Sequence, residues 1–336
     1  MFISIFGALE SGLIYALMAL GVYLSFRVLD FPDLTVDGSF VTGAAMAAVM
    51  IINGQSPVVA TIAAVITGFI AGCFTGLLHT KGKINPLLSG ILMMIALYSI
   101  NLRIMGQSNI PLLGETTIFS SVTSFWESLN LSAPFNAVIG ALGVPGTPQT
   151  WAILFIALIV TLIIKCITDY FLKTEVGLAL RATGDNQKMI RSFSANTDIL
   201  IIMGLGISNA FVALSGALIA QHGGFADVGM GIGMIIIGLA SVIIGEALFG
   251  TKTIARTTLA VIGGAVIYRI VVSLALRVDF LETGDMKLIT AIIVIAALVT
   301  PKILESQRER RRRLRKKAEL AEVASLEEGG KRNAAT

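Results

Sequence analysis

Long apolar segments, separated by short polar connections, constrain the fold of this chain more than any other feature. They lie near residues 4–26, 39–52, 58–78, 86–105, 149–172, 199–221, 232–249, 254–276 and 288–304. A helix needs about 20 apolar residues to cross the hydrocarbon core of a bilayer, where it satisfies its own backbone hydrogen bonds. Hydrophobic residues make up 55% of the chain and charged residues 14%, which is typical of polytopic membrane proteins. We therefore predict an all-α membrane protein with about nine transmembrane helices.

Basic residues gather on one side of this arrangement, which predicts its orientation. They occur at Lys81, Lys83, Lys252 and Arg256, throughout residues 173–198, and in the C-terminal tail. The connection 106–150 contains no Lys or Arg. Because short cytoplasmic loops carry the excess of Lys and Arg, we expect a cytoplasmic C-terminus and an external N-terminus, in the cell membrane of a prokaryote.

The composition changes abruptly after Pro301, where a basic run from Glu305 to Lys317 begins. We interpret residues 1–304 as a transmembrane domain and residues 305–336 as a disordered, basic cytoplasmic tail. A basic run directly after a final span favours attraction to anionic membrane lipid, worth about 1 kcal/mol per basic residue. We do not expect nucleic acid to be a partner.

A polar stretch at 173–198 interrupts the apolar segments and cannot lie in hydrocarbon. Each charge at the bilayer centre costs roughly 2.5 to 3.5 kcal/mol, so the stretch is predicted to be cytoplasmic. Residues 177–182 indicate one short amphipathic helix, Gly184 a break, and residues 186–194 a second short helix. Two short helices side by side would fill a groove on a partner protein.

A second irregular stretch, Asp30 to Gly38, contains a proline and three carboxylates and is predicted to be non-helical. Such backbone survives near a membrane only inside protein or beside water. The stretch from Phe31 faintly resembles the one from Phe225, so that Asp33 pairs with Asp227, five spans later. This offset favours an inverted repeat with the pathway at the repeat interface, although a shared turn preference explains the match equally well. The candidate pathway residues are Asp33, Asp37, Gly38, Asp227 and Gly229.

Charged residues inside or beside the predicted spans are Glu10, Arg27, Arg103, Glu246 and Arg269. Glu10 and Arg269 lie deepest. Charges within a membrane are often functional, but those near helix ends usually extend to the interface. We favour ion pairs within the protein or interfacial positions for all of them over contact with a substrate.

The chain contains no motif for catalysis or for a cofactor. The segment from Gly245 to Thr253 fails the phosphate-binding pattern, because an extra Thr precedes Lys252. His79, His222, Cys73 and Cys166 match no metal-ligand spacing. We expect no catalytic residue, no metal and no cofactor, so the energy for any transport must come from elsewhere. The region 106–150 is predicted to place an amphipathic helix on the outer surface, either as a seat for an external partner or as an interfacial cap.

Four stretches carry a resemblance to a known family. They are Gly177-Leu-Ala-Leu-Arg-Ala-Thr-Gly-Asp-Asn, Ser194-Ala-Asn-Thr-Asp, Ala213-Leu-Ser-Gly-Ala-Leu and Tyr15-Ala-Leu-Met-Ala-Leu-Gly. Together they resemble permease subunits of ATP-binding-cassette (ABC) importers of the branched-chain amino-acid and ribose class. In that family a similar Gly-x-Ala-x-Arg-Ala loop docks into a cytoplasmic ATPase. The resemblance assigns ATPase coupling to Glu175, Gly177, Ala179, Arg181, Ala182, Gly184, Asp185 and Arg191.

The resemblance also implies partners and a substrate class. The partners are a cytoplasmic ABC ATPase, an extracytoplasmic substrate-binding protein and a second permease subunit in a homodimer. Where amino-acid permeases usually have an Asn-Phe-Ala-His-Gly type stretch, this chain has Asp30-Phe-Pro-Asp-Leu-Thr-Val-Asp-Gly. This variant resembles the subfamily that works with binding proteins for aromatic amino acids, which implies tryptophan or tyrosine as the substrate.

Two other functions remain as alternatives. One is an ion-coupled secondary transporter in which Glu10, Asp33, Asp37 or Asp227 binds H⁺ or Na⁺. The other is a membrane scaffold that transports nothing.

Overall fold

The computed structural model describes residues 2–130, 132–134, 136, 148, 150–192 and 196–275, with residues 288, 291, 292, 295 and 299 beyond them. The chain divides into two units, Met1–Thr290 and Ala291–Thr336. Every element named below lies in the first unit. The tail predicted from residue 305 and most of the ninth predicted segment, near 288–304, fall outside the described residues.

Eight helices among the described residues are long and apolar enough to cross a bilayer. They agree with the first eight apolar segments and are α1 (Phe2–Tyr23) with its π-helical extension η1 (Leu24–Val28), α2 (Thr35–Ile52), α3 (Pro57–Thr80), α4 (Pro86–Met105), α7 (Ala152–Phe171), α9 (Thr197–Gly223), α10 (Met234–Phe249) and α11 (Ile254–Ala275). Smaller elements are α5 (Ile118–Ser128), α8 (Glu175–Ser192), the 3-10 helix η2 (Val228–Gly231) and strands β1 (Asn109–Pro111) and β2 (Phe225–Asp227), which pair antiparallel. The nearly all-α fold predicted from the sequence is confirmed.

Local sequence explains where several of these helices begin and end. Pro57 and Pro86 open α3 and α4, where the missing amide hydrogen is not needed. The Asn85 side chain accepts a hydrogen bond from the Leu87 amide, and the Asn196 side chain caps α9 in the same way. The helices α4 and α9 end at Gly106 and Gly224, both of which have a positive φ.

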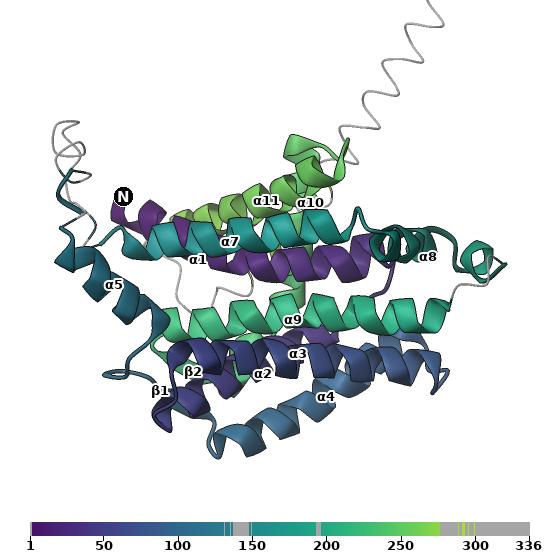
Figure 1. Ribbon diagram of the computed structural model, residues 1–336, viewed down its shortest axis with the longest axis horizontal. Coiled ribbons are helices and arrows are strands. Elements are labelled where there is room, and N and C mark those ends of the chain that lie inside the picture. Colours follow the sequence, from purple (N-terminus) through teal and green to yellow (C-terminus); the bar gives the residue numbers. More distant parts are fainter. Residues whose placement is uncertain are drawn as a thin grey trace, which may run out of the picture. The chain divides into compact units, whose positions relative to one another are not determined.

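Helix α9 lies between α1 on one side and α2 and α3 on the other (Figure 1). Small residues bring these helices into close contact. A Cβ atom added to Gly43 of α2 would lie 2.0 Å from the Ala213 carbonyl oxygen, and one added to Gly72 of α3 would lie 2.2 Å from the Leu205 carbonyl oxygen. Such contacts stabilise helix packing in membranes, where lipid tails are as apolar as the side chains.

Helix α2 begins inside the bundle rather than at its edge. The preceding Asp33 is fully buried, and its carboxylate accepts a hydrogen bond of 2.7 Å from Asn209, which stands at the middle of α9. The Asp33 carboxylate also accepts a hydrogen bond of 2.9 Å from the Thr35 amide, so the helix starts at Thr35. The prediction of a non-helical stretch was therefore wrong for residues 35–38, which are helical.

The predicted inverted repeat finds only local support. Asp227 accepts a hydrogen bond of 2.7 Å from the Gly229 amide, the same two-residue turn that Asp33 makes with Thr35. The repeat as a whole stays a prediction.

Candidate coupling and translocation sites

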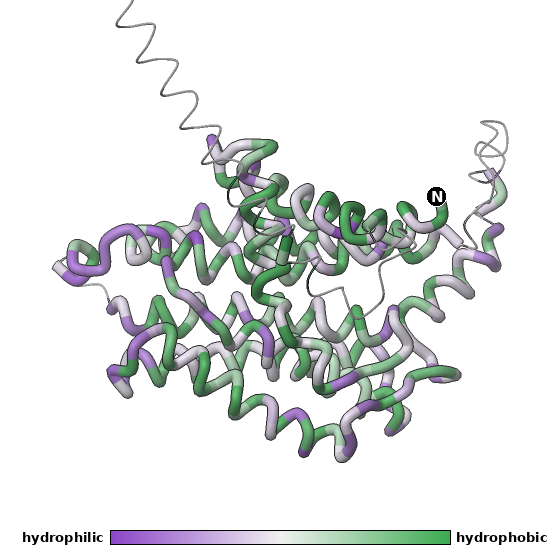
Figure 2. Tube along the Cα trace, turned by 180° about the vertical axis from the view of Figure 1, so that it is seen from behind, coloured by the Kyte–Doolittle hydropathy of each residue, from purple (hydrophilic) through white to green (hydrophobic). Residues whose placement is uncertain are grey.

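Helix α8 forms the polar end of the bundle, opposite to β1 and β2 (Figures 1 and 2). The sequence predicted two helices broken at Gly184, and this position was wrong: the backbone is helical at Gly184 and kinks at Asn186, with φ −153° and ψ 89°. The Asn186 side chain accepts a hydrogen bond from the Met189 amide at 3.1 Å and so opens the second part. That part is described as far as Ser192; Ser194, its predicted end, lies outside the described residues.

The predicted coupling residues divide between two faces of α8. Gly177, Ala179, Ala182 and Gly184 are buried or half-buried against the bundle, whereas Glu175, Arg181, Asp185 and Arg191 are exposed. The apolar side chains of Val176, Leu178 and Met189 are exposed beside these charges. This outward face, with charged and apolar side chains together, has the character of a protein-docking surface.

The inner face of α8 rests on the end of the first span. A Cβ atom added to Gly184 would lie 2.1 Å from the Val28 carbonyl oxygen, the last residue of η1. One added to Gly204 of α9 would lie 2.6 Å from Leu29 and 2.7 Å from Leu180 of α8. Gly184 is thus needed for the close approach of α8 to η1, which is why it does not break the helix.

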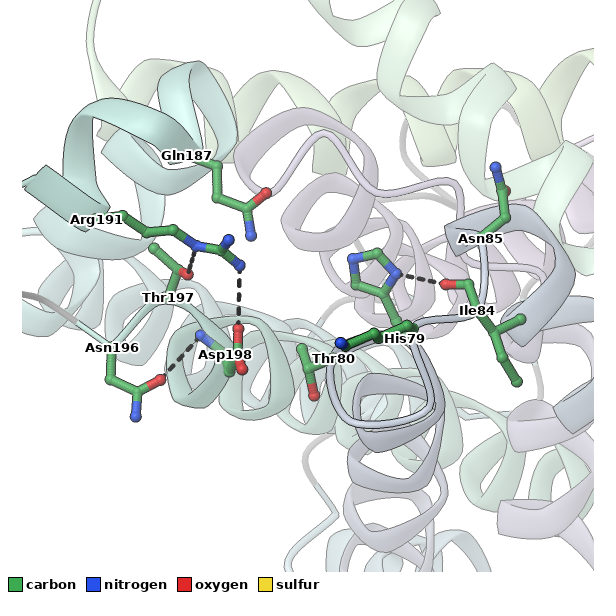
Figure 3. A pocket seen from close by; sticks show the side chains of 10 residues that line it. His79, Thr80, Ile84, Asn85, Gln187, Arg191, Asn196, Thr197 and Asp198 are labelled. Carbon is green, nitrogen blue, oxygen red and sulfur yellow. Dashed lines mark hydrogen bonds and ion pairs between the residues drawn. The ribbon is translucent and has the colours of Figure 1, made fainter.

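Two cavities flank α8. The first, of about 650 Å³, lies between α8 and η1 and is lined by residues that include Arg27, Asp30, Arg181 and Asp185. The second, of about 830 Å³, lies between the second part of α8, the start of α9 and the α3–α4 loop. In this second cavity Arg191 donates to the Thr197 hydroxyl at 2.9 Å and to Asp198 at 3.3 Å (Figure 3). Arg191 therefore also holds α8 to the start of α9.

A charged pair connects η1 to α10. The Arg27 guanidinium forms an ion pair with the Glu246 carboxylate, with its Nε atom 3.0 Å from both carboxylate oxygens. This agrees with the ion-pair role that we favoured for charges near helix ends. Glu10 lies 3.9 Å from His222, near the end of α9, and Arg269 donates to Ser11 at 3.3 Å and covers the Tyr15 ring. Arg103 is exposed.

A buried polar cluster surrounds the start of α2. Besides Asn209 and Asp33, the Thr35 hydroxyl of α2 lies 2.8 Å from the Thr75 hydroxyl of α3. The side-chain oxygens of Ser39 and Asn209 are buried without a hydrogen-bond partner among the described residues. The cluster joins α2, α3 and α9 at the buried start of α2.

One turn further along α2, Asp37 binds the start of α10. Its carboxylate accepts hydrogen bonds from the backbone amides of Gly233 at 2.9 Å and Ile235 at 2.8 Å. These amides would otherwise lack partners, because the first turn of a helix has none of its own. Asp37 thus caps α10 from a different helix, which the sequence did not predict.

A cleft of about 390 Å³ opens beside Asp37. Its walls come from α2, α4 and the segment before α10, and the lining residues are Asp37, Gly38, Val41, Met94, Ile95, Tyr98, Ser99, Asn101, Val228, Gly231 and Ile232. Of the predicted pathway residues, only Asp37 and Gly38 line it. Asp227 and Gly229 lie in the turn that leads to its wall, and Asp33 is buried beneath the start of α2. The contribution of α4 was missed, since its residues read as an ordinary apolar span.

Residues 4–298 match the family described as the permease component of branched-chain amino acid transport systems. The chain belongs to this permease family. The permease is 45% identical over 296 residues to the tyrosine transport system permease protein of Clostridioides difficile, covering 88% of this chain and 90% of that protein. It is 27% identical over 255 residues to the galactofuranose transporter permease protein of Escherichia coli, covering 75% of this chain and 66% of that protein. A solved metal-chelate type ABC transporter, in an inward-facing conformation, matches with a TM-score of 0.47 and 15% identity over 91% of this chain and 85% of that one.

Family membership confirms the resemblance predicted from the sequence. The permease is the multi-pass, membrane-spanning component of an ABC transporter, a class of subunit that moves a solute rather than catalysing a reaction itself. This identity favours transport over the scaffold alternative. It also favours ATP-driven transport over the ion-coupled alternative, since ABC permeases work with ATPase and binding-protein partners.

Proposed function

We propose that this permease imports an amino acid with an aromatic side chain across the plasma membrane of a prokaryote. An extracytoplasmic binding protein delivers the substrate, and a separate cytoplasmic ATPase drives the cycle. The 45% identity to a tyrosine transport system permease supports the substrate class. The basic residues on the α8 side of the bundle support a cytoplasmic α8 and C-terminus.

The observation that carries the coupling part of this proposal is the seat of α8 on η1. The exposed residues Glu175, Arg181 and Asp185 would contact the ATPase, while Gly184 on the opposite face touches the Val28 carbonyl. A partner that moves α8 therefore also pushes on the end of the first span. The buried turn at Asp33 and the start of α2 follow directly after that point.

We further propose that two such permeases form a homodimer and work by alternating access, and contacts within each chain support the alternating access. Arg27 of η1 is paired with Glu246 of α10, and the first turn of α10 is held by Asp37 of α2. Binding of ATP would close two ATPase subunits and shift both α8 helices. The shift would favour one of two arrangements of α2 and α10 around the cleft, because a partner changes an equilibrium only through contacts that differ between the two states.

Co-purification from the native membrane tests the proposal. We expect an ABC ATPase to accompany the permease and Arg181→Glu to remove it, because that variant reverses an exposed charge on α8. Combining it with Arg191→Glu should remove the ATPase fully, although Arg191 also holds the start of α9. Arg103→Glu, an exposed charge reversal on α4, should retain the ATPase. If the unaltered permease never brings an ATPase with it, the proposal fails and the ion-coupled carrier becomes the leading function.

A further inference from the structure

The cleft beside Asp37 lies in the part of the bundle between the middle of α9 and the end that carries β1 and β2, which is the external side if α8 is cytoplasmic as proposed. Asp37 stands in the first turn of α2, which begins level with the middle of α9. The wall from Val228 to Ile232 follows directly on β2, which pairs with β1 at the end of the bundle away from α8 (Figure 1). A solute that enters from outside would therefore meet the cleft before it reaches the buried cluster at Asp33.

Among the residues that the structure describes, Asp37 is the one charged residue that lines the cleft. The described residues that line it include the Asp37 carboxylate but no Lys, Arg or His. The carboxylate is held by the backbone amides of Gly233 and Ile235, and it remains partly accessible. Charged groups within spans face the protein interior or a water-filled space, because contact with hydrocarbon is costly. The accessible part of the Asp37 carboxylate lines the cleft, where its charge would attract a cation such as an ammonium group.

The remaining walls suit an apolar ring. Tyr98 and Ile232 are 53% and 61% exposed, and the half-buried Met94 lies on the same α4 surface as Tyr98. Aromatic rings stack on tyrosine and contact methionine sulfur favourably. A volume of about 390 Å³ is within the range of small-molecule sites, which combine apolar walls with a few polar groups.

One polar atom of the wall also lacks a partner. The Asn101 amide donates to the Gly38 carbonyl at 3.1 Å, but its Oδ1 atom is buried and accepts no hydrogen bond among the described residues. A buried acceptor without a donor costs about 1–3 kcal/mol. A ligand hydroxyl or a water would recover part of that free energy if the wall moved enough to expose this atom.

We propose that this cleft is a substrate subsite on the translocation pathway that takes an amino acid with an aromatic side chain. The ammonium group lies toward Asp37, and the ring lies against Met94, Tyr98 and Ile232. The inference rests on the proposed import function and adds a site within the permease, separate from the specificity of the binding protein.

Binding of radiolabelled tyrosine to the purified permease–ATPase complex, without binding protein, tests the subsite. We expect saturable binding that tyramine displaces and 3-(4-hydroxyphenyl)propionate does not, because only tyramine keeps the ammonium group. Tyr98→Ala should weaken binding by about tenfold, the factor that corresponds to ~1.4 kcal/mol. Asp37→Asn should weaken it as well. Tyr170→Ala is the matched control, since Tyr170 is 75% exposed on α7 and does not line the cleft.

Three results would overturn the subsite: no saturable tyrosine binding by the unaltered complex, equal affinity in Tyr98→Ala, or displacement by the propionate rather than by tyramine. Tyr98 is exposed, so its variant should fold even if Asp37→Asn loosens the cap of α10. ATP-driven uptake of tyrosine by proteoliposomes, with the binding protein present, tests the import function separately from the subsite. Uptake without a subsite leaves the import function standing, whereas absence of uptake in the unaltered system refutes the import function itself.

Discussion

Replacing Gly184 with alanine tests whether α8 acts through its contact with η1. The added Cβ atom would lie 2.1 Å from the Val28 carbonyl oxygen and 3.0 Å from the Leu29 Cα atom, whereas ordinary contact begins at 3.4 Å. The nearest neighbours are backbone atoms, so no side-chain rotation relieves the overlap. The two segments must separate by about 1.3 Å, the difference between 2.1 and 3.4 Å.

The cost of this change should appear in coupling rather than in folding. Overpacking costs about 1–3 kcal/mol when the surroundings cannot give way, but α8 has an exposed outer face and can move outward. Alanine also stabilises a helix by ~0.5–1 kcal/mol relative to glycine. We therefore expect the melting temperature to change little. A lifted α8 loses its contact with η1, and ATP-driven uptake should fall by at least about tenfold, which corresponds to ~1.4 kcal/mol.

The assay compares ATP hydrolysis with substrate uptake in proteoliposomes that contain the permease, the ATPase and the loaded binding protein. We expect hydrolysis to continue and uptake to fall in Gly184→Ala. Gly7→Ala is the control, because a Cβ atom at Gly7 in α1 meets nothing within 4 Å, and both rates should be retained. Unchanged uptake per ATP in Gly184→Ala would show that the contact between α8 and η1 does not transmit the movement.

Two further predictions concern stability and coupling within the membrane. Arg27→Glu places two carboxylates together and should lower the melting temperature and uptake, while combination with Glu246→Arg should restore most of both. A double-mutant cycle in detergent measures the melting temperatures, and losses that simply add would contradict the ion pair. Asp33→Ala removes the acceptor for the Asn209 amide and the Thr35 backbone amide, so stability should fall by about 1–3 kcal/mol for each donor left without a partner. Thermal unfolding measures the loss, and a melting temperature equal to that of the unaltered permease would contradict the buried cluster.

The sequence predicted the spans well because length and hydropathy decide them. A long apolar segment in a bilayer forms a helix because the helix satisfies its own backbone hydrogen bonds. The first eight segments could therefore be predicted without knowing their neighbours. The turn before α2 was only partly predictable. Its proline and carboxylates indicated irregular backbone, but the helix starts as soon as Asp33 can accept from the Thr35 amide, and this depends on the buried position of Asp33 beside Asn209.

The errors at the functional sites have a common cause. Glycine within a polar helix was read as a break, because it lowers helix stability, whereas Gly184 serves a contact with Val28, 156 residues away in the chain. The Asn186 kink had a readable signal, since asparagine is a preferred N-cap. Tyr98 and Met94 had no readable signal, because in a sequence an apolar residue that faces a cleft cannot be told from one that faces lipid. Only the placement of α2 and the segment before α10 beside α4 distinguishes them.

The start of α2 explains why two separate connections run between α8 and α10. One passes through η1 to the Arg27–Glu246 pair, near the end of α10; the other passes through Leu29 and the Asp33 turn to Asp37, which holds the beginning of α10. Both connections end on one rigid helix, so a movement of α8 acts on α10 at two points. Loss of the ion pair should then weaken coupling without abolishing it, because Asp37 still holds the first turn. Loss of the contact at Gly184 should weaken coupling more strongly, since both connections begin at this contact between α8 and η1.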